Sequence, residues 1–147
     1  MPSAYGNFEI KGFLNTSDKR EAVALIKGDI SGDEPVLVRV HSQCLTGDIF
    51  ASTVCSCGDK LHNALNLIEE KGRGVVLYLY KDTSQSGFLN SPEGLFTPHN
   101  PNETNSEGYG FGAMCLRNLG LKKIKLISDT PLTINLLSSY GLEIVDK

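Results

Sequence analysis

The chain has 147 residues, of which 40% are hydrophobic and 21% are charged, with a formal net charge of −3; this is enough for a single globular domain over residues 1–147. The negative charge argues against general attraction to nucleic-acid phosphates, although it leaves room for a local basic pocket that binds a small anion. No apolar run reaches the ~20 residues of a membrane span, and the first residues lack the pattern of a signal peptide, so we expect a cytoplasmic protein without membrane or nucleic-acid partners.

The first half of the chain predicts strands that flank one helix. Short apolar or alternating runs, which are typical of strands, occur at residues 22–27, 36–41 and 74–80. Residues 59–71 instead place apolar side chains at helical spacing, and Gly72 follows as the expected C-cap.

The second half begins with a segment, residues 84–110, that is rich in Gly, Pro and Asn. We expect a long loop or a reduced element there, which in a small domain is usually functional or mobile. The pattern is regular again afterwards, and it predicts a helix from residue 112 to Gly120, a strand at 123–128, a helix at 131–139 and a strand at 141–145. Alternating strands and helices indicate an α/β fold with a mixed or mostly parallel sheet and packed helices.

Three of the four cysteines, Cys44, Cys55 and Cys57, fall within fourteen residues. In a chain expected in the cytoplasm, such a cluster favours a metal site or free thiols over disulfides. Thiolates are soft ligands that suit zinc, and three protein ligands leave a fourth position for water or substrate. Zinc with such an open position lowers the pKa of water towards ~7, so the cluster is a candidate hydrolytic centre.

The spacing alone leaves other interpretations open. The zinc site could be closed and structural, with His41, His62 or Cys115 as fourth ligand, or the three thiols could be unrelated. Cys115 falls on the apolar face of its predicted helix, where we expect a small buried hydrophobic residue rather than a ligand.

Residues 39–61, RVHSQCLTGDIFASTVCSCGDKL, closely resemble the signature of GTP cyclohydrolase II, R-V-H-S-E/Q-C-L-T-G-D followed by S-x-x-C-x-C-G. The resemblance continues through EEKGRGVVLYLY, GYGFGAMCLRNLGLKKIKLIS and YGLEIV. It implies zinc on Cys44, Cys55 and Cys57, and hydrolytic opening of the imidazole ring of GTP with loss of formate. It also implies release of pyrophosphate with magnesium assisting, a product that enters riboflavin synthesis, and a homodimer.

The resemblance also assigns substrate contacts. It carries nucleotide binding to the end of a strand and to one lysine, at Arg39, Val40, His41, Ser42, Gln43 and Lys60. A strand end beside a metal offers backbone groups and one guanidinium to a bound nucleotide. Without the adjacent cysteines, Arg39 would be interpreted as an exposed strand residue.

The departures from the family gather where the triphosphate should bind. The family's R-Q-E-G-R-G-I-G-L corresponds to YKDTSQSGF, which places Asp82 and Ser84 at phosphate-contact positions and removes both arginines. The family's A-D-x-R, with a proposed base and a proposed nucleophile, aligns these two catalytic positions with Asn105 and Glu107. The family's T-N-N-P-x-K keeps its hydroxyl at Ser128 and loses its lysine.

At least three cationic groups are therefore missing, and each lost charge-assisted contact typically costs ~1.5–3 kcal/mol. Three hypotheses remain open. The first is a zinc hydrolase that opens the ring of GTP or a closely related nucleotide. The second is the same chemistry on another nucleotide, a nucleoside or a free base, and the third is a zinc-binding protein without catalysis.

Overall fold

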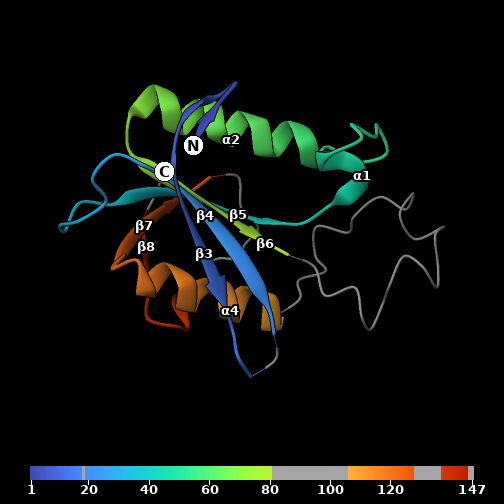
Figure 1. Ribbon diagram of the computed structural model, residues 1–147. Coiled ribbons are helices and arrows are strands. Elements are labelled where there is room, and N and C mark those ends of the chain that lie inside the picture. Colours follow the sequence, from blue (N-terminus) through green and yellow to red (C-terminus); the bar gives the residue numbers. More distant parts are fainter. Residues whose placement is uncertain (18, 81–105, 128–136, 146–147) are drawn as a thin grey trace.

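The computed structural model describes residues 1–17, 19–80, 106–127 and 137–145. Its main feature is a sheet in the order β3-β4-β6-β5-β7-β8, accompanied by a two-stranded ribbon, β1-β2 (Figure 1). The strands are β1 (Pro2–Ser3), β2 (Gly6–Asn7), β3 (Glu9–Leu14), β4 (Glu21–Lys27), β5 (Val36–Ser42), β6 (Gly74–Leu79), β7 (Lys123–Leu126) and β8 (Glu143–Ile144). β3, β4 and β6 pair antiparallel, whereas β6, β5, β7 and β8 pair parallel. The predicted α/β fold with a mixed sheet is confirmed.

Helices cover the two faces of this sheet (Figure 1). α2 (Cys57–Lys71) follows β5 and the short α1 (Leu45–Asp48), and it leads into β6 on one face. α4 (Ser106–Asn118) lies on the other face and precedes β7. α2 ends as predicted, because Gly72 has a left-handed φ of 75° and its N–H donates a 2.8 Å hydrogen bond to the carbonyl of Ile68.

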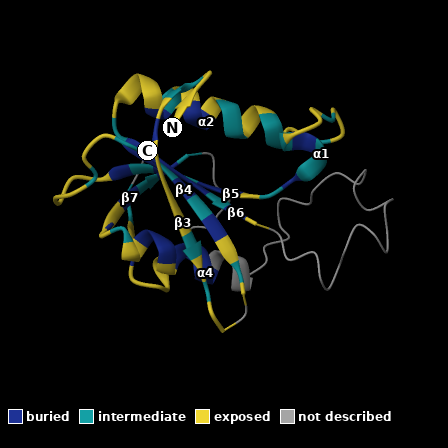
Figure 2. Cartoon of the chain, viewed as in Figure 1, coloured by how far each residue is buried: buried dark blue, intermediate teal, exposed yellow. Residues whose placement is uncertain are grey.

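Neighbouring side chains of a strand point to opposite faces of the sheet, so those of the central strands enter different cores. Figure 2 colours much of these strands as buried or intermediate. Val36, Val38 and Val40 of β5 are buried together with Cys115 and Leu116 of α4. On the opposite face, Val76 is buried with residues of α2, namely Ala64, Leu65 and Ile68. The odd-numbered residues of β5 after Leu37, which are Arg39 and His41, share this second face. The sheet therefore directs polar residues of β5 toward the side that carries α1 and α2.

The short elements β1, β2 and α1 were not predicted, and two further features differ from the sequence-based expectation. β3 was not predicted; it is an edge strand that pairs with β4 from Glu9 to Leu14, and most of its residues are exposed. α4 begins at Ser106 rather than at residue 112, so the predicted irregular segment 84–110 is wrong for its last five residues. This stretch packs closely, since a Cβ added at Gly110 would lie only 2.6 Å from the hydroxyl oxygen of Tyr140. Tertiary contact of this kind overrides the low helix propensity of glycine.

Other expectations fall outside the described residues: the conformation of 84–105 and all but the end of the predicted helix 131–139. None of the helices within the described ranges has the length and apolar character needed to cross a membrane.

Candidate metal centre

The three clustered cysteines lie just beyond the carboxyl end of β5. Cys44 follows this strand and precedes α1, whereas Cys57 is the first residue of α2. All three Sγ atoms lie within 4.8 Å of one another, with Sγ of Cys44 3.6 Å from Sγ of Cys55. The carboxyl edge of parallel strands is where α/β proteins usually bind ligands. The structure thus brings together the three cysteines that their spacing predicted as metal ligands.

Two glycines allow this close approach. A Cβ on Gly47 would lie 2.8 Å from Sγ of Cys55 and 3.2 Å from Sγ of Cys44. A Cβ on Gly58 would collide with the carbonyl oxygen of Gly47. The glycines of the T-G-D and C-x-C-G motifs are therefore required because α1 and the start of α2 pack directly against each other and against the sulfurs.

The thiols differ in their acidity. Burial raises the pKa of Cys55, but hydrogen bonds from Cys57 and Cys44 outweigh this effect and leave it below the ordinary value. Burial, reinforced by the neighbouring thiols, raises the pKa of Cys57 well above the usual range. A cation bound among them would favour all three thiolates, and the amino end of α2 adds a partial positive charge there.

The donor set fits a soft divalent cation such as zinc. Among the described residues, no further His, Cys, Asp or Glu joins the group of three. The proposed fourth ligands are engaged elsewhere: Nε2 of His41 lies 2.9 Å from Oδ1 of Asp48, His62 stacks on Tyr5 at 4.8 Å, and Cys115 is in the core. Within the described part of the chain, three thiols therefore leave one coordination position open, which is the arrangement of catalytic zinc sites.

A buried carboxylate lies next to the sulfurs. Oδ2 of Asp48 accepts hydrogen bonds from the backbone N–H of Cys44 at 3.0 Å and from the Tyr78 hydroxyl at 2.8 Å. Burial raises the pKa of Asp48, yet the hydrogen bonds from His41, Cys44 and Tyr78 outweigh it and hold this pKa below its ordinary value. Burial and the bond to Asp48 raise the pKa of Tyr78 far above the usual range. Neither Asp48 nor Tyr78 was predicted as a site residue from the sequence, although Asp48 is the last residue of the T-G-D motif.

The predicted substrate-contact residues of β5 lie on opposite faces of the sheet. The guanidinium of Arg39 contacts the carbonyl of Ile127 at 3.4 Å and Nδ1 of His41 at 3.5 Å, on the face that carries α2. Val40 points into the opposite core, so only its backbone could contact a ligand on the cysteine side. Ser42 is exposed at the end of the strand.

Two further predicted contacts lie around the cysteines. Gln43 is anchored through its backbone, whose N–H donates to the carbonyl of Leu79 at 2.8 Å. Lys60 is exposed on α2, three residues after Cys57 and thus on the same side of the helix.

The remaining predicted positions cannot be placed around this centre. Asp82, Ser84, Asn105 and Ser128 lie outside the described residues. Glu107 belongs to the first turn of α4, and its side chain is also outside the described part.

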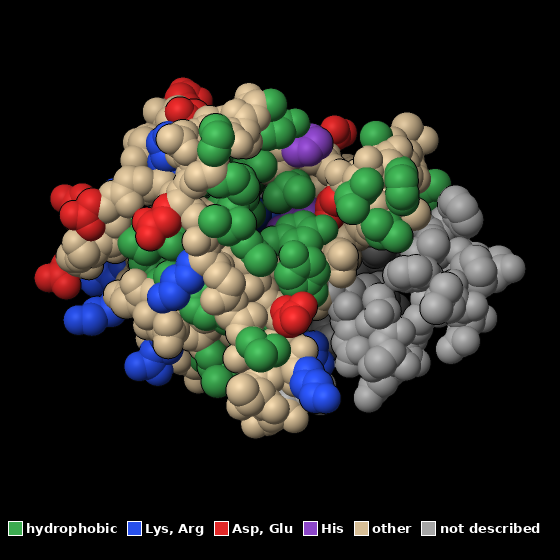
Figure 3. Space-filling model, in the orientation of Figure 1, with side chains coloured by type: hydrophobic (Ala, Val, Ile, Leu, Met, Phe, Trp, Pro, Cys, Tyr) green, Lys and Arg blue, Asp and Glu red, His purple; other side chains and the backbone are tan. Residues whose placement is uncertain are grey.

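An exposed apolar loop adjoins the cysteines. In the connection between α1 and α2, Ile49, Phe50 and Val54 are 63%, 69% and 38% exposed. Figure 3 shows hydrophobic side chains gathered over this connection and along the strands beside it. The three cysteines therefore lie next to an exposed apolar surface.

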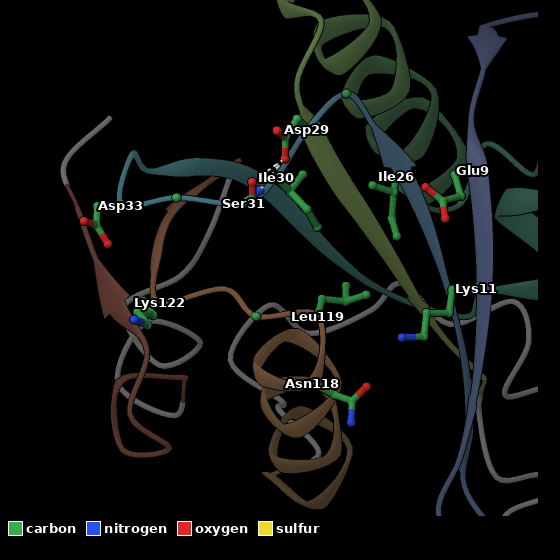
Figure 4. Close-up of a pocket in the computed structure, with 13 residues that line it drawn as sticks. Glu9, Lys11, Ile26, Asp29, Ile30, Ser31, Asp33, Asn118, Leu119 and Lys122 are labelled. Atoms are coloured by element: carbon green, nitrogen blue, oxygen red, sulfur yellow. Dashed lines mark hydrogen bonds between the residues drawn. The ribbon is translucent and has the colours of Figure 1, made fainter.

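A cavity of about 490 Å³ lies at the other end of the sheet (Figure 4). It is lined by residues before β5, including Asp29 and Asp33, and by residues before β7, including Lys122. These segments precede the amino ends of parallel strands, whereas the cysteines follow a carboxyl end. The cavity contains none of the predicted site residues, so it is separate from the metal centre.

Comparisons with known proteins agree with the motif. The family model for GTP cyclohydrolase II matches residues 1–147. The riboflavin biosynthesis protein RibBA of Bacillus cytotoxicus is 46% identical, and RibBA of Chlorobium phaeovibrioides is 41% identical, each over the whole of this chain. The chain spans about 40% of the length of these relatives.

A solved structure supports the fold alone. The crystal structure of RibBX, a two-domain 3,4-dihydroxy-2-butanone 4-phosphate synthase from A. baumannii, matches with a TM-score of 0.57 and 22% identity, over the whole of this chain and 38% of that one. The match of the family model to residues 1–147 establishes the family to which the chain belongs. The chain belongs to the GTP cyclohydrolase II family.

Proposed function

We propose that this domain holds one zinc ion on Cys44, Cys55 and Cys57 and opens the imidazole ring of GTP or a closely related purine nucleotide, releasing formate. The observation that carries the proposal is the convergence of three sulfurs, without a fourth protein ligand among the described residues. Family membership supports the reaction class, because a hydrolytic ring opening needs an activated water, and an open zinc site provides one. Riboflavin biosynthesis is the process named for the relatives.

Zinc bound there supplies a Lewis acid and a source of hydroxide at neutral pH. The chain's own groups hold and orient the nucleotide. Lys60 is exposed one turn after Cys57 and can contact an anionic group. Ser42 offers a hydroxyl at the end of β5, and the apolar side chain of Phe50 can pack against the purine. Arg39 and His41 contact each other on the same face and shape the floor of the site.

The proposal extends to features that rest on family resemblance. These are magnesium, which would assist the release of pyrophosphate, assembly as a homodimer, and a cytoplasmic location. Asp82, Ser84 and Ser128 remain proposed phosphate contacts, and Asn105 and Glu107 remain the positions aligned with the family's base and nucleophile.

A second candidate keeps the ring opening but moves it to a smaller substrate, such as a nucleoside monophosphate, a nucleoside or a free base. The favouring observation is the loss of both arginines of the family's R-Q-E-G-R-G-I-G-L, where this chain reads YKDTSQSGF. Neither a carboxylate nor a hydroxyl replaces the planar fork with which arginine grips phosphate oxygens. A zinc-binding protein without catalysis is the remaining alternative.

Formate release tests these alternatives. Zinc-loaded protein is incubated with GTP, GMP and guanosine, and formate is assayed together with zinc content. Formate from GTP supports the proposal, formate from GMP or guanosine alone supports the second candidate, and no formate from any of them leaves only the zinc-binding protein. Cys55→Ser should lose both zinc and formate, whereas Cys115→Ala, which changes a thiol in the core, should retain both.

A further inference from the structure

Asp48 has no role in the function proposed so far, yet it is among the most buried polar groups of the site. Its side chain is only 3% exposed, and it is not part of the group of described residues that converge for a metal. Burial of a carboxylate is costly unless hydrogen bonds compensate. Both oxygens are compensated, Oδ1 by His41 and Oδ2 by Cys44 and Tyr78.

The contact with Cys44 involves the backbone on both sides of that residue. The N–H of Cys44 donates to the Asp48 side chain at 3.0 Å, and the carbonyl of Cys44 accepts from the backbone N–H of Asp48 at 2.8 Å. These two bonds restrict the dihedral angles that aim the Cys44 side chain. The position of one sulfur of the cluster therefore depends on where the Asp48 carboxylate is held.

The carboxylate is in turn held by two rigid strands. His41 of β5 and Tyr78 of β6 are register partners, and their rings stack at 5.6 Å with planes 16° apart. The guanidinium of Arg39 can only donate, so its contact with Nδ1 of His41 makes that nitrogen an acceptor and leaves the proton on Nε2, facing Asp48. Each carboxylate oxygen thus receives a donor from the sheet.

We propose that Asp48, Tyr78 and His41 form a positioning network that fixes Cys44 for metal binding. The inference rests on the metal centre proposed above and goes beyond it, because it assigns to non-ligand residues the geometry of the site. Partners that orient ligands in this way typically change metal affinity by about 10–100-fold when they are removed.

Tyr78→Phe is the decisive variant, because it removes one donor to Oδ2 and leaves the stacked ring. Tyr80→Phe is the matched control: Tyr80 packs edge-on against Tyr78 at 5.8 Å and is 42% exposed. Zinc affinity is measured by competition with a chromophoric chelator, and geometry is read from the absorption spectrum of the cobalt(II)-substituted protein. We expect Tyr78→Phe to bind zinc about 10–100-fold more weakly with an altered cobalt spectrum, and Tyr80→Phe to match the wild type.

Asp48→Asn should act in the same direction, because an amide offers one oxygen and turns its NH₂ group toward a donor. If Asp48→Asn does not fold, the zinc affinity and cobalt spectrum of Tyr78→Phe still test the proposal. A purely structural role would lower the unfolding midpoint of Tyr78→Phe and leave zinc affinity and the cobalt spectrum of the folded protein unchanged, and this result would overturn the proposal. Absence of zinc binding by the wild-type chain would instead overturn the metal centre itself.

Discussion

The backbone of Gly47 lies so close to the side chain of Cys55 that a methyl group on Gly47 would be 2.8 Å from Sγ. Real Cβ atoms do not tolerate such a distance, so one of the two would have to move. Cβ of Cys57 would lie at 3.1 Å and Sγ of Cys44 at 3.2 Å. Glycine is therefore required at the point where the three proposed ligands and α1 meet, and its substitution is a direct way to disturb the metal centre without removing a ligand.

Gly47→Ala should weaken zinc binding. Forcing a methyl group into a packed region typically costs about 1–3 kcal/mol, and about 1.4 kcal/mol corresponds to a tenfold change in affinity. The measurement is chelator competition on the purified variant. Gly12→Ala in β3 is the control, because a Cβ there meets no atom within 4 Å. An affinity of Gly47→Ala equal to that of the control would mean that the sulfurs do not hold the ion where the structure brings them together.

Removal of the metal should destabilise the domain. Three sulfurs tie the end of β5 to the start of α2, and a ligand present at ~1000 times its dissociation constant stabilises the native state by ~4 kcal/mol. For a domain of this size, that corresponds to roughly 10 °C in the unfolding temperature. Thermal unfolding followed by circular dichroism, with and without a chelator, measures the difference. The unfolding temperature of Cys55→Ser should be the same with and without the chelator. A wild-type protein whose unfolding temperature did not change with the chelator would contradict the prediction.

The buried thiol of Cys115 should contribute to a loss of stability at alkaline pH. Burial raises the pKa of Cys115 from the usual 9.0 of a cysteine thiol to about 11. Above pH 9 the unfolded chain loses this proton while the folded chain retains it, so stability falls as pH rises towards 11, by at most about 1.4 kcal/mol per pH unit. Cys115→Ala should lack this part of the alkaline decline in denaturant titrations. Parallel curves for the two proteins between these pH values would show that Cys115 does not stay protonated in the fold.

Sequence patterns predicted the elements that bury apolar side chains at a regular period. Alternation in β5 and helical spacing in α2 were sufficient because Val36, Val38 and Ile68 are buried by those periods. β3 escaped prediction because an edge strand buries little; Ile10 is 53% exposed, and Gly12 interrupts the run. α1 escaped because its four residues are too few for any period.

The residues of the candidate site likewise include some that the sequence predicted and some that it did not. Cysteine spacing identified the three sulfurs, since C-x-C at the start of a helix is a local pattern. Asp48 could be recognised only in three dimensions, because its partners Cys44, His41 and Tyr78 come from two strands and a turn, and Tyr78 lies thirty residues from Asp48 in the sequence. Hydrogen bonds between strands depend on the pairing register, and the sequence does not reveal that register directly.

The missing arginines lead to the last prediction, which concerns catalysis on GTP. Glu107 aligns with an arginine proposed in the family as the nucleophile at phosphorus, and it lies in the first turn of α4. Glu107→Arg should raise GTP turnover, because a carboxylate repels the triphosphate and a guanidinium binds it; one restored charge-assisted contact of about 1.5 kcal/mol corresponds to roughly tenfold. Release of pyrophosphate and of formate is measured for each variant. Glu107→Gln separates the two causes, since an equal rise in this variant would assign the gain to relief of repulsion alone. Unchanged turnover in both variants would show that residue 107 is remote from the phosphates, and that the alignment of this segment with the family is wrong.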